Sequence, residues 1–175
     1  MTIQFPKLNT KTGLYSGRGM KKRPHSHVLY YGDCVITAIS NFLILKGWKP
    51  KKIHLIQEKF FKHPLYNEKE GTFPTSSIPE LIEEILNAKP TLYIFNKQLA
   101  LNLKQDFPIQ KHIEIGSDIP IKSFPCLGLT ENYSNHTHLF VYFLKDNIIH
   151  VADNDGKVHD SDIHPIDGYI ETKLD

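Results

Sequence analysis

Residues 31–40 read YGDCVITAIS and place a lone cysteine where a turn gives way to an apolar segment. Gly32 allows a tight or left-handed backbone, and Asp33 is a favourable N-cap residue. Cys34 would then lie in the first turn of a helix, beside free backbone N–H groups at the positive end of the helix dipole. Because such a position stabilises a thiolate, this stretch predicts a nucleophilic cysteine at the start of a helix.

The segment after this cysteine predicts a long helix in the interior of the domain. Residues 34–46 carry apolar side chains on nearly every face of a helix, and the polar side chains between 35 and 45 form one narrow stripe: Thr37, Ser40 and Asn41. A helix this apolar is buried on most sides and does not lie on a surface. Lys46 and Gly47 predict where the helix ends.

Beyond this helix the pattern changes from helical to extended near the middle of the chain. Two more helices are predicted, one over residues 52–61 and one that follows Ser77 as its N-cap. A short helix is predicted over 96–106, and strands are predicted over 91–95, 124–130, 138–144 and 148–153. The order predicts an α+β fold, in which N-terminal helices pack on a C-terminal antiparallel sheet.

Length and composition indicate a single domain. The chain has 175 residues, and we expect residues 1–24 to form an irregular arm and residues 25–175 to form one domain. A net charge of +2 gives no sign of a nucleic-acid partner. No apolar run approaches the ~20 residues of a membrane span, so none is predicted. Residues 1–22 contain no apolar signal segment, so we expect a cytoplasmic protein or one exported without a cleavable N-terminal signal.

The chain has two cysteines, Cys34 and Cys126. Small secreted scaffolds usually carry more, so we expect free thiols in a reducing compartment. Cys126 lies inside an apolar strand pattern and is predicted to be a buried, unreactive side chain. Cys34 is therefore the candidate nucleophile.

A thiol hydrolase also needs a base and a group that orients the base. His138 opens the most apolar strand of the chain and is the candidate base. The hairpin after it carries two candidate orienting residues, Asp153 and Asn154. Their choice depends on register: if Leu144 pairs with Ile148 around a three-residue turn, Asn154 faces His138, whereas a bulge or a one-residue slip brings Asp153 opposite.

Five short motifs follow one another in the order in which one protein family carries them. They are Asp33-Cys34, Gly71-Thr72, Phe124-Pro125-Cys126-Leu127, His138-Leu139-Phe140-Val141 and Val151-Ala152-Asp153-Asn154. The set resembles the papain-like cysteine peptidase fold, and within it the group of bacteriocin-leader peptidase domains and short bacterial and phage proteins. The resemblance spans roughly Tyr30 to Gly156, which is most of the chain.

The resemblance implies that Cys34 is the nucleophile, His138 the base and Asp153 the residue that orients the base, with Asn154 as the alternative. Many of these peptidases carry a glutamine before the cysteine that stabilises the oxyanion, where this chain has Val28. The nearby polar candidates for that role are His27 and Asp33, and the Cys34 backbone N–H is a further donor.

The predicted function is therefore a cysteine hydrolase that cleaves a peptide or isopeptide amide bond through an acyl-thioester. It needs no cofactor, and its substrate is a protein or peptide. One alternative is a papain-like deamidase or transferase, such as an effector that modifies a protein glutamine. Another is an inactive papain-like binding module. A metal site built on His136-x-His138 or His25-x-His27 is the least favoured interpretation, so no metal is predicted.

Overall fold

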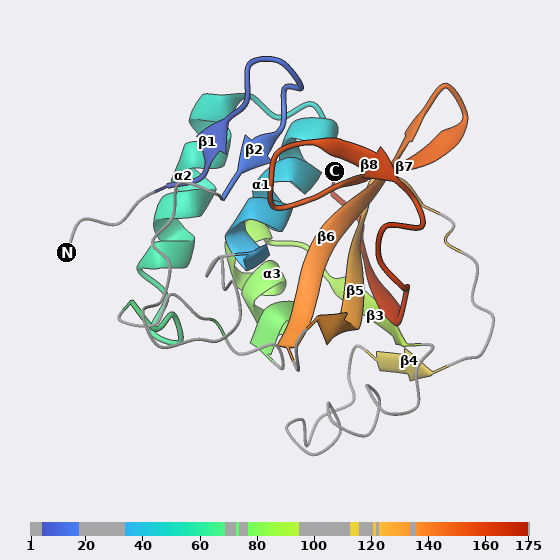
Figure 1. Ribbon diagram of the computed structural model, residues 1–175. Coiled ribbons are helices and arrows are strands. Elements are labelled where there is room, and N and C mark those ends of the chain that lie inside the picture. Colours follow the sequence, from blue (N-terminus) through green and yellow to red (C-terminus); the bar gives the residue numbers. More distant parts are fainter. Residues whose placement is uncertain are drawn as a thin grey trace.

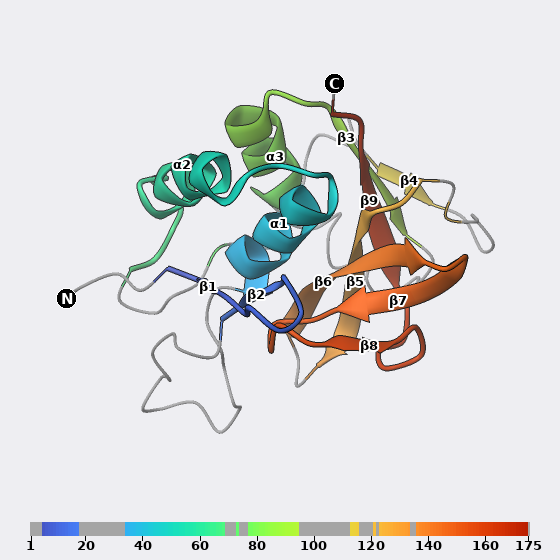
Figure 2. The same cartoon turned by 90° about the horizontal axis from the view of Figure 1, so that it is seen from above.

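Three helices pack on one face of a β-sheet, as Figure 2 shows from above. The computed structural model describes residues 5–17, 34–68, 73, 77–94, 113–115, 121, 123–133 and 136–174. The helices are α1 (Cys34–Leu45), α2 (Pro50–Phe61) and α3 (Ile78–Leu86). All three were predicted, but the side chain of Ser77 makes no capping hydrogen bond to α3. None of the helices in the described part of the chain is long and apolar enough to cross a membrane.

The main sheet has the strand order β4-β3-β9-β5-β6-β7-β8 (Figure 1). Five of its six neighbouring pairs are antiparallel, and the sixth, β4 on β3 at one edge, is parallel. The predicted α+β class, with helices on an antiparallel sheet, is confirmed. The strands are β3 (Pro90–Ile94), β4 (Ile113–Ile115), β5 (Cys126–Tyr133), β6 (His136–Lys145), β7 (Ile148–Ala152), β8 (Val158–Asp160) and β9 (Gly168–Thr172).

The interior helix α1 is buried as predicted, and its polar stripe anchors the elements around it. Asn41 accepts a hydrogen bond from the backbone N–H of Tyr15 at 2.6 Å and donates one to the carbonyl of Tyr15 at 3.1 Å. Ser40 donates to the carbonyl of Ile36 and accepts from Gln57 of α2. Buried polar side chains are tolerated when they are paired in this way, so Ser40 and Asn41 of the stripe fix α1 against α2 and the N-terminal segment.

The N-terminal segment contains a small hairpin of β1 (Lys7–Leu8) and β2 (Tyr15–Ser16). The irregular arm expected over residues 1–24 is thus partly regular, because Asn41 binds the backbone of Tyr15 on both sides. Leu14 and Tyr15 belong to the main hydrophobic core. The division into an arm and one domain remains a prediction.

Hydrophobic residues pack on both faces of the sheet. The larger core joins the three helices to the face that carries Leu139, Val141 and Phe143. A smaller core covers the opposite face and consists of Cys126, Phe140, Tyr142, Val151 and Tyr169. Alternate residues of β6 therefore belong to different cores, as the two-residue period of a strand requires.

The hairpin between β6 and β7 has a tighter turn than expected. Lys145 pairs with Ile148, so the turn has two residues, Asp146 and Asn147, and both have positive φ angles of 55° and 61°. Two-residue hairpin turns require such angles, which asparagine and aspartate tolerate. The three-residue turn that would have placed Asn154 opposite His138 is wrong, because the true register is shifted by one residue.

Three strands of the sheet were not predicted: β4, β8 and β9. The last strand, β9, inserts between β3 and β5 and pairs with both. The predicted helix over residues 96–106 and the Gly71-Thr72 motif lie outside the described residues.

Candidate catalytic site

The first residue of α1 is Cys34, as the sequence predicted. It is a free thiol of intermediate exposure, and its side chain packs against the edge of the main core. At this position the sulfur lies at the positive end of the helix dipole, beside backbone N–H groups that have no partner within the helix. Cys34 is thus a partly exposed thiol at a helix N-terminus.

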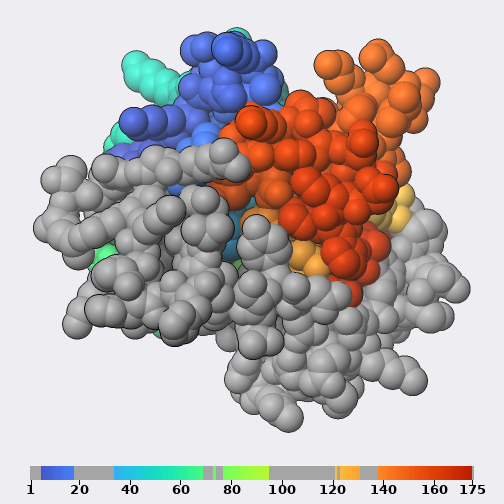
Figure 3. Space-filling model, in the orientation of Figure 1, coloured from blue at the N-terminus to red at the C-terminus, as the bar shows by residue number. Residues whose placement is uncertain are grey.

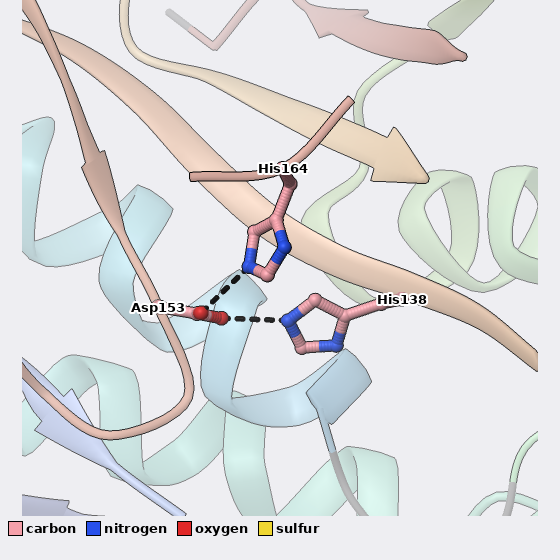
Figure 4. A group of neighbouring side chains, drawn as sticks. All are labelled: His138, Asp153 and His164. Atoms are coloured by element: carbon pink, nitrogen blue, oxygen red, sulfur yellow. Dashed lines mark hydrogen bonds and ion pairs between the residues drawn. The ribbon is translucent and has the colours of Figure 1, made fainter. Parts of the chain in front are cut away.

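His138 lies in β6 and contacts both Cys34 and Asp153, the residue that follows β7. The His138 side chain is 10% exposed, and its Nε2 lies 2.6 Å from Oδ1 of Asp153. The ring also hydrogen-bonds the side chain of Cys34. Since Nε2 faces Asp153, Nδ1 is the nitrogen left for the thiol, and Figure 4 shows it on the side of the first turn of α1. The three residues predicted as nucleophile, base and orienting group therefore form one connected chain.

The electrostatics of His138 are dominated by its two partners. Burial by itself disfavours a charged ring, but the hydrogen bonds to Asp153 and Cys34, with the negative charges of both groups, outweigh it and raise the pKa of His138 to about 10. The imidazolium is thus the favoured form of the ring at neutral pH.

Asp153 follows directly after β7 and uses both carboxylate oxygens. Oδ1 accepts hydrogen bonds from Nε2 of His138 and from the backbone N–H of Asn154 at 2.8 Å, and Oδ2 lies 2.7 Å from Nε2 of His164. Burial would raise the pKa of Asp153, but these donors and the positive charge of His138 hold it well below its ordinary range. The carboxylate is therefore ionised at neutral pH and acts as an acceptor.

The hairpin register explains why Asp153 reaches the ring. Val151 pairs with Tyr142 of β6, so the side chains of these two residues share one face of the sheet. Asp153 lies two residues beyond Val151, and His138 lies four residues before Tyr142, which places both on that same face. A diagonal neighbour at the end of a ladder is close enough for a carboxylate to contact an imidazole.

The other residues predicted around the site have different outcomes. Within the described part of the chain, Oδ1 of Asn154, the alternative orienting group, has no hydrogen-bond partner. The backbone carbonyl of Asn154 accepts from the N–H of Gly17 at 2.8 Å. Asn154 therefore does not orient the ring of His138. The two oxyanion candidates, His27 and Asp33, lie outside the described residues.

Cys126 provides an internal contrast to Cys34. It is 1% exposed in β5, as predicted, and burial together with the nearby negative charge of Glu171 raises its pKa to about 12. A thiol in this environment stays protonated and unreactive at neutral pH.

Sequence reasoning missed His164, which lies in the segment between β8 and β9. Figure 4 shows the carboxylate of Asp153 joined by dashed lines to the rings of both His138 and His164. The sequence around His164 has no period and no motif, so nothing in it points to the site. Its role depends on the path of a loop that returns to the sheet, which the sequence pattern does not specify.

Among the described residues, His138, Asp153 and His164 lie close enough together to be considered as ligands of a metal ion. The ligand atoms of His138, Asp153 and His164 lie within 4.8 Å of one another. Ligand atoms around a tetrahedral zinc ion are about 3.3 Å apart, given metal–ligand distances of ~2.0–2.1 Å. The nitrogen–oxygen distances of 2.6 and 2.7 Å are shorter and fit direct N–H···O hydrogen bonds. The geometry is that of a hydrogen-bonded network.

We compared the chain with protein-family models, curated proteins and solved structures, and no match was found in any of the three comparisons.

Proposed function

We propose that this chain is a papain-like cysteine hydrolase, which cleaves an amide bond in a protein or peptide through Cys34, His138 and Asp153. The observation that carries the proposal is the continuous contact from the Asp153 carboxylate through the His138 ring to the Cys34 thiol at a helix N-terminus. Each contact joins the group that a nucleophile, a base and an orienting residue require.

The papain-like assignment is supported by the order and placement of the elements. A cysteine begins an interior helix, a histidine lies on the antiparallel strand that packs against this helix, and an aspartate follows the next strand. These are the positions that the resemblance implied for Cys34, His138 and Asp153. Packing alone does not require all three residue types at one point of the fold.

In the first half of the proposed reaction, the Cys34 thiolate attacks the carbonyl carbon of the substrate. A carbon–sulfur bond forms while the carbonyl electron pair moves to oxygen, where the Cys34 backbone N–H donates a hydrogen bond. The intermediate collapses, the carbon–nitrogen bond breaks, and the His138 imidazolium gives its proton to the departing nitrogen. The products of this half are a free amine and an acyl-thioester on Cys34.

In the second half, water regenerates the thiol. Neutral His138 takes a proton from a water molecule, whose oxygen attacks the thioester carbon. The carbon–sulfur bond then breaks, the carboxylic acid product leaves, and the thiolate–imidazolium pair is restored. Asp153 stays ionised throughout and holds the ring in the orientation that serves both halves.

The proposal is tested by the rate at which iodoacetamide alkylates each cysteine of the folded protein near neutral pH. We expect Cys34 to react at least about a hundredfold faster than Cys126, because one thiol is activated and the other is buried. EDTA is expected to leave the rate unchanged, since no metal takes part. Equal labelling of the two cysteines, measured by peptide mass spectrometry, would refute the activated thiolate.

Turnover is tested with a library of proteome-derived peptides. The wild-type protein is expected to create new peptide termini that the Cys34→Ala variant does not create. A gain of about one mass unit without new termini would instead indicate glutamine deamidation by the same triad. If neither change occurs although Cys34 is selectively alkylated, the binding-module alternative replaces the hydrolase.

A further inference from the structure

The second oxygen of Asp153 has its own partner within the site. Nε2 of His164 lies 2.7 Å from Oδ2 of Asp153, while Oδ1 serves His138. Asp153 is ionised and can only accept, so His164 donates from Nε2 whether its ring is neutral or charged. The ring of His164 is largely buried, which removes water as a competing donor.

Aromatic packing holds the ring of His164 in place. Its centroid lies 4.9 Å from that of His138, with the two planes at 68°, and 4.9 Å from that of Phe140. The ring of Phe140 in turn occupies the space that Gly128 of β5 leaves by having no side chain. The ring of His164 is thus packed against two other rings while its Nε2 faces Asp153.

Without His164, the other two donors to Asp153, Nε2 of His138 and the backbone N–H of Asn154, both bind the same oxygen, Oδ1. Because the terminal torsion of a carboxylate is broad, the group could then tilt about that oxygen and weaken the alignment of the His138 ring with Cys34. Two donors on two different oxygens, from rings that are steeply inclined to one another, define the plane of the carboxylate. The orientation needed for His138 is then set before any substrate binds.

We propose that His164 is a positioning residue, which holds the Asp153 carboxylate in the orientation that keeps the His138 ring aligned with Cys34. This inference rests on the proposed function, because it assigns His164 to the same site. The titratable groups around this site come from separate elements. His138 of β6 contacts both Cys34 of α1 and Asp153, and His164, from the segment before β9, contacts Asp153.

The test is the pH dependence of Cys34 alkylation by iodoacetamide in matched variants. His164→Phe keeps a ring against Phe140 but removes the donor, and His164→Gln keeps an N–H donor at a similar reach. The control is His159→Phe. Nε2 of His159 lies 2.8 Å from Oδ2 of Asp155, so this substitution removes a comparable histidine–aspartate pair from the neighbouring turn.

We expect His164→Phe to raise the pH of half-maximal alkylation by about one unit, which is a roughly tenfold loss of rate on the acid side. His164→Gln should restore most of the shift, and His159→Phe should leave the profile unchanged. A destabilised but correctly aligned site would lower the melting temperature without moving the midpoint. An unchanged midpoint in His164→Phe, or a lower one, would overturn the inference, because His164 would then only compete with His138 for the charge of Asp153.

The wild-type protein separates this inference from the proposed function. If Cys34 of the wild type reacts no faster than Cys126, both fail together. If Cys34 of the wild type is activated but His164→Phe does not raise the pH of half-maximal alkylation, the proposed function stands and the inference fails. Should His164→Phe not fold, nuclear magnetic resonance of ¹⁵N-histidine-labelled wild-type protein decides: a proton on Nε2 of His164, shielded from exchange, is expected, and its absence refutes the role.

Discussion

Asp153 is the residue on which the candidate site depends most. Its two oxygens receive two imidazole donors and one backbone N–H, and its side chain is 14% exposed. A half-satisfied buried network costs more stability than an apolar cluster of the same size, whereas a fully satisfied one is rigid. The carboxylate therefore binds both the backbone of its own turn and the histidine that contacts the thiol.

Asp153→Asn is expected to disable the thiol without changing the shape of the side chain. Asparagine has one acceptor oxygen and no charge, so the imidazolium of His138 loses its counterion and its pKa falls toward 6.5. The rate of Cys34 alkylation at about pH 6 should fall roughly 10- to 100-fold.

The matched control for this experiment is Asp155→Asn, two residues further along the same turn. The carboxylate of Asp155 accepts hydrogen bonds from His159 and from the backbone N–H of Lys157, which are different partners from those of Asp153. The alkylation rate of Asp155→Asn should match that of the wild type. Equal losses in both variants would mean that the turn matters only as a scaffold.

At this scale the sequence predicts residues that lie in patterned segments and misses those that do not. Cys34, His138 and Asp153 each stand at the end of a helix or strand pattern, and the structure brings them together. His164 lies in an unpatterned loop, and its contact with Asp153 arises from tertiary folding alone. Local periodicity carries no information about such a contact.

Among the elements, the N-terminal hairpin and the turn after β7 support each other. Figure 3 shows the blue surface of the hairpin directly beside the orange to red surface of the C-terminal strands. Thr12 donates to the carbonyl of Gly156 at 2.6 Å, and the N–H of Gly17 donates to the carbonyl of Asn154. Both contacts brace the turn that begins at Asp153.

Gly17→Ala is expected to loosen this contact. A Cβ at this position would lie 2.5 Å from Oδ1 of Asn154 and 2.8 Å from Oγ1 of Thr37, closer than real side chains approach. Because both atoms are buried, the backbone must shift, and we expect a loss of about 1–3 kcal/mol in the free energy of unfolding.

Urea unfolding monitored by circular dichroism measures this loss, with Lys11→Ala as the control. Lys11 is exposed in the same hairpin, so its truncation should change stability by less than about 0.5 kcal/mol. If Gly17→Ala were as stable as the wild type, the close packing of the hairpin on Asn154 and α1 would be wrong.

At the scale of elements, the sequence predicted which segments form helices and strands better than how they pair. The hairpin between β6 and β7 was expected, but a one-residue difference in turn length decides whether Asn154 or Asp153 reaches His138. Both Asp146 and Asn147 accept positive φ angles, so the sequence allowed either turn. Packing of alternate β6 residues into two separate cores selects the register.

For the molecule as a whole, the charged site makes stability depend on pH in a defined way. The raised pKa of His138 means that the folded state retains a proton between pH 6.5 and about 10, where the unfolded state has lost it. The lowered pKa of Asp153 means that the folded state stays ionised below 3.8, where the unfolded state becomes protonated. Stability from this pair is therefore present between pH 3.8 and 6.5, and it declines on both sides.

We expect the free energy of unfolding to fall by at most about 1.4 kcal/mol per pH unit on each side of this window. Asp153→Asn should flatten both slopes, because it removes the carboxylate and lowers the pKa of His138. Urea titrations between about pH 3 and pH 10 measure this, with Asp155→Asn as the reference. Identical slopes in the wild type and Asp153→Asn would show that other groups control the pH dependence.

The overall class of the fold could be predicted, but its sheet order could not. Helical and extended periodicities separate the two halves of the chain, which was enough to predict α+β. The short strands β8 and β9 have no period long enough to detect, and β9 joins strands that lie far from it in sequence. Long-range pairing of this kind is decided by the core that it completes, not by its own residues.

The place of β9 has a consequence for how the protein is made. β3 and β5 each bond to β9 and lie on either side of it, so the sheet consists of two unjoined parts until residues 168–172 leave the ribosome. By then Cys34, His138, Asp153 and His164 have all been synthesised. A nascent chain that stops short of β9 thus carries every reactive group of the site but lacks the strand that closes the sheet beneath them.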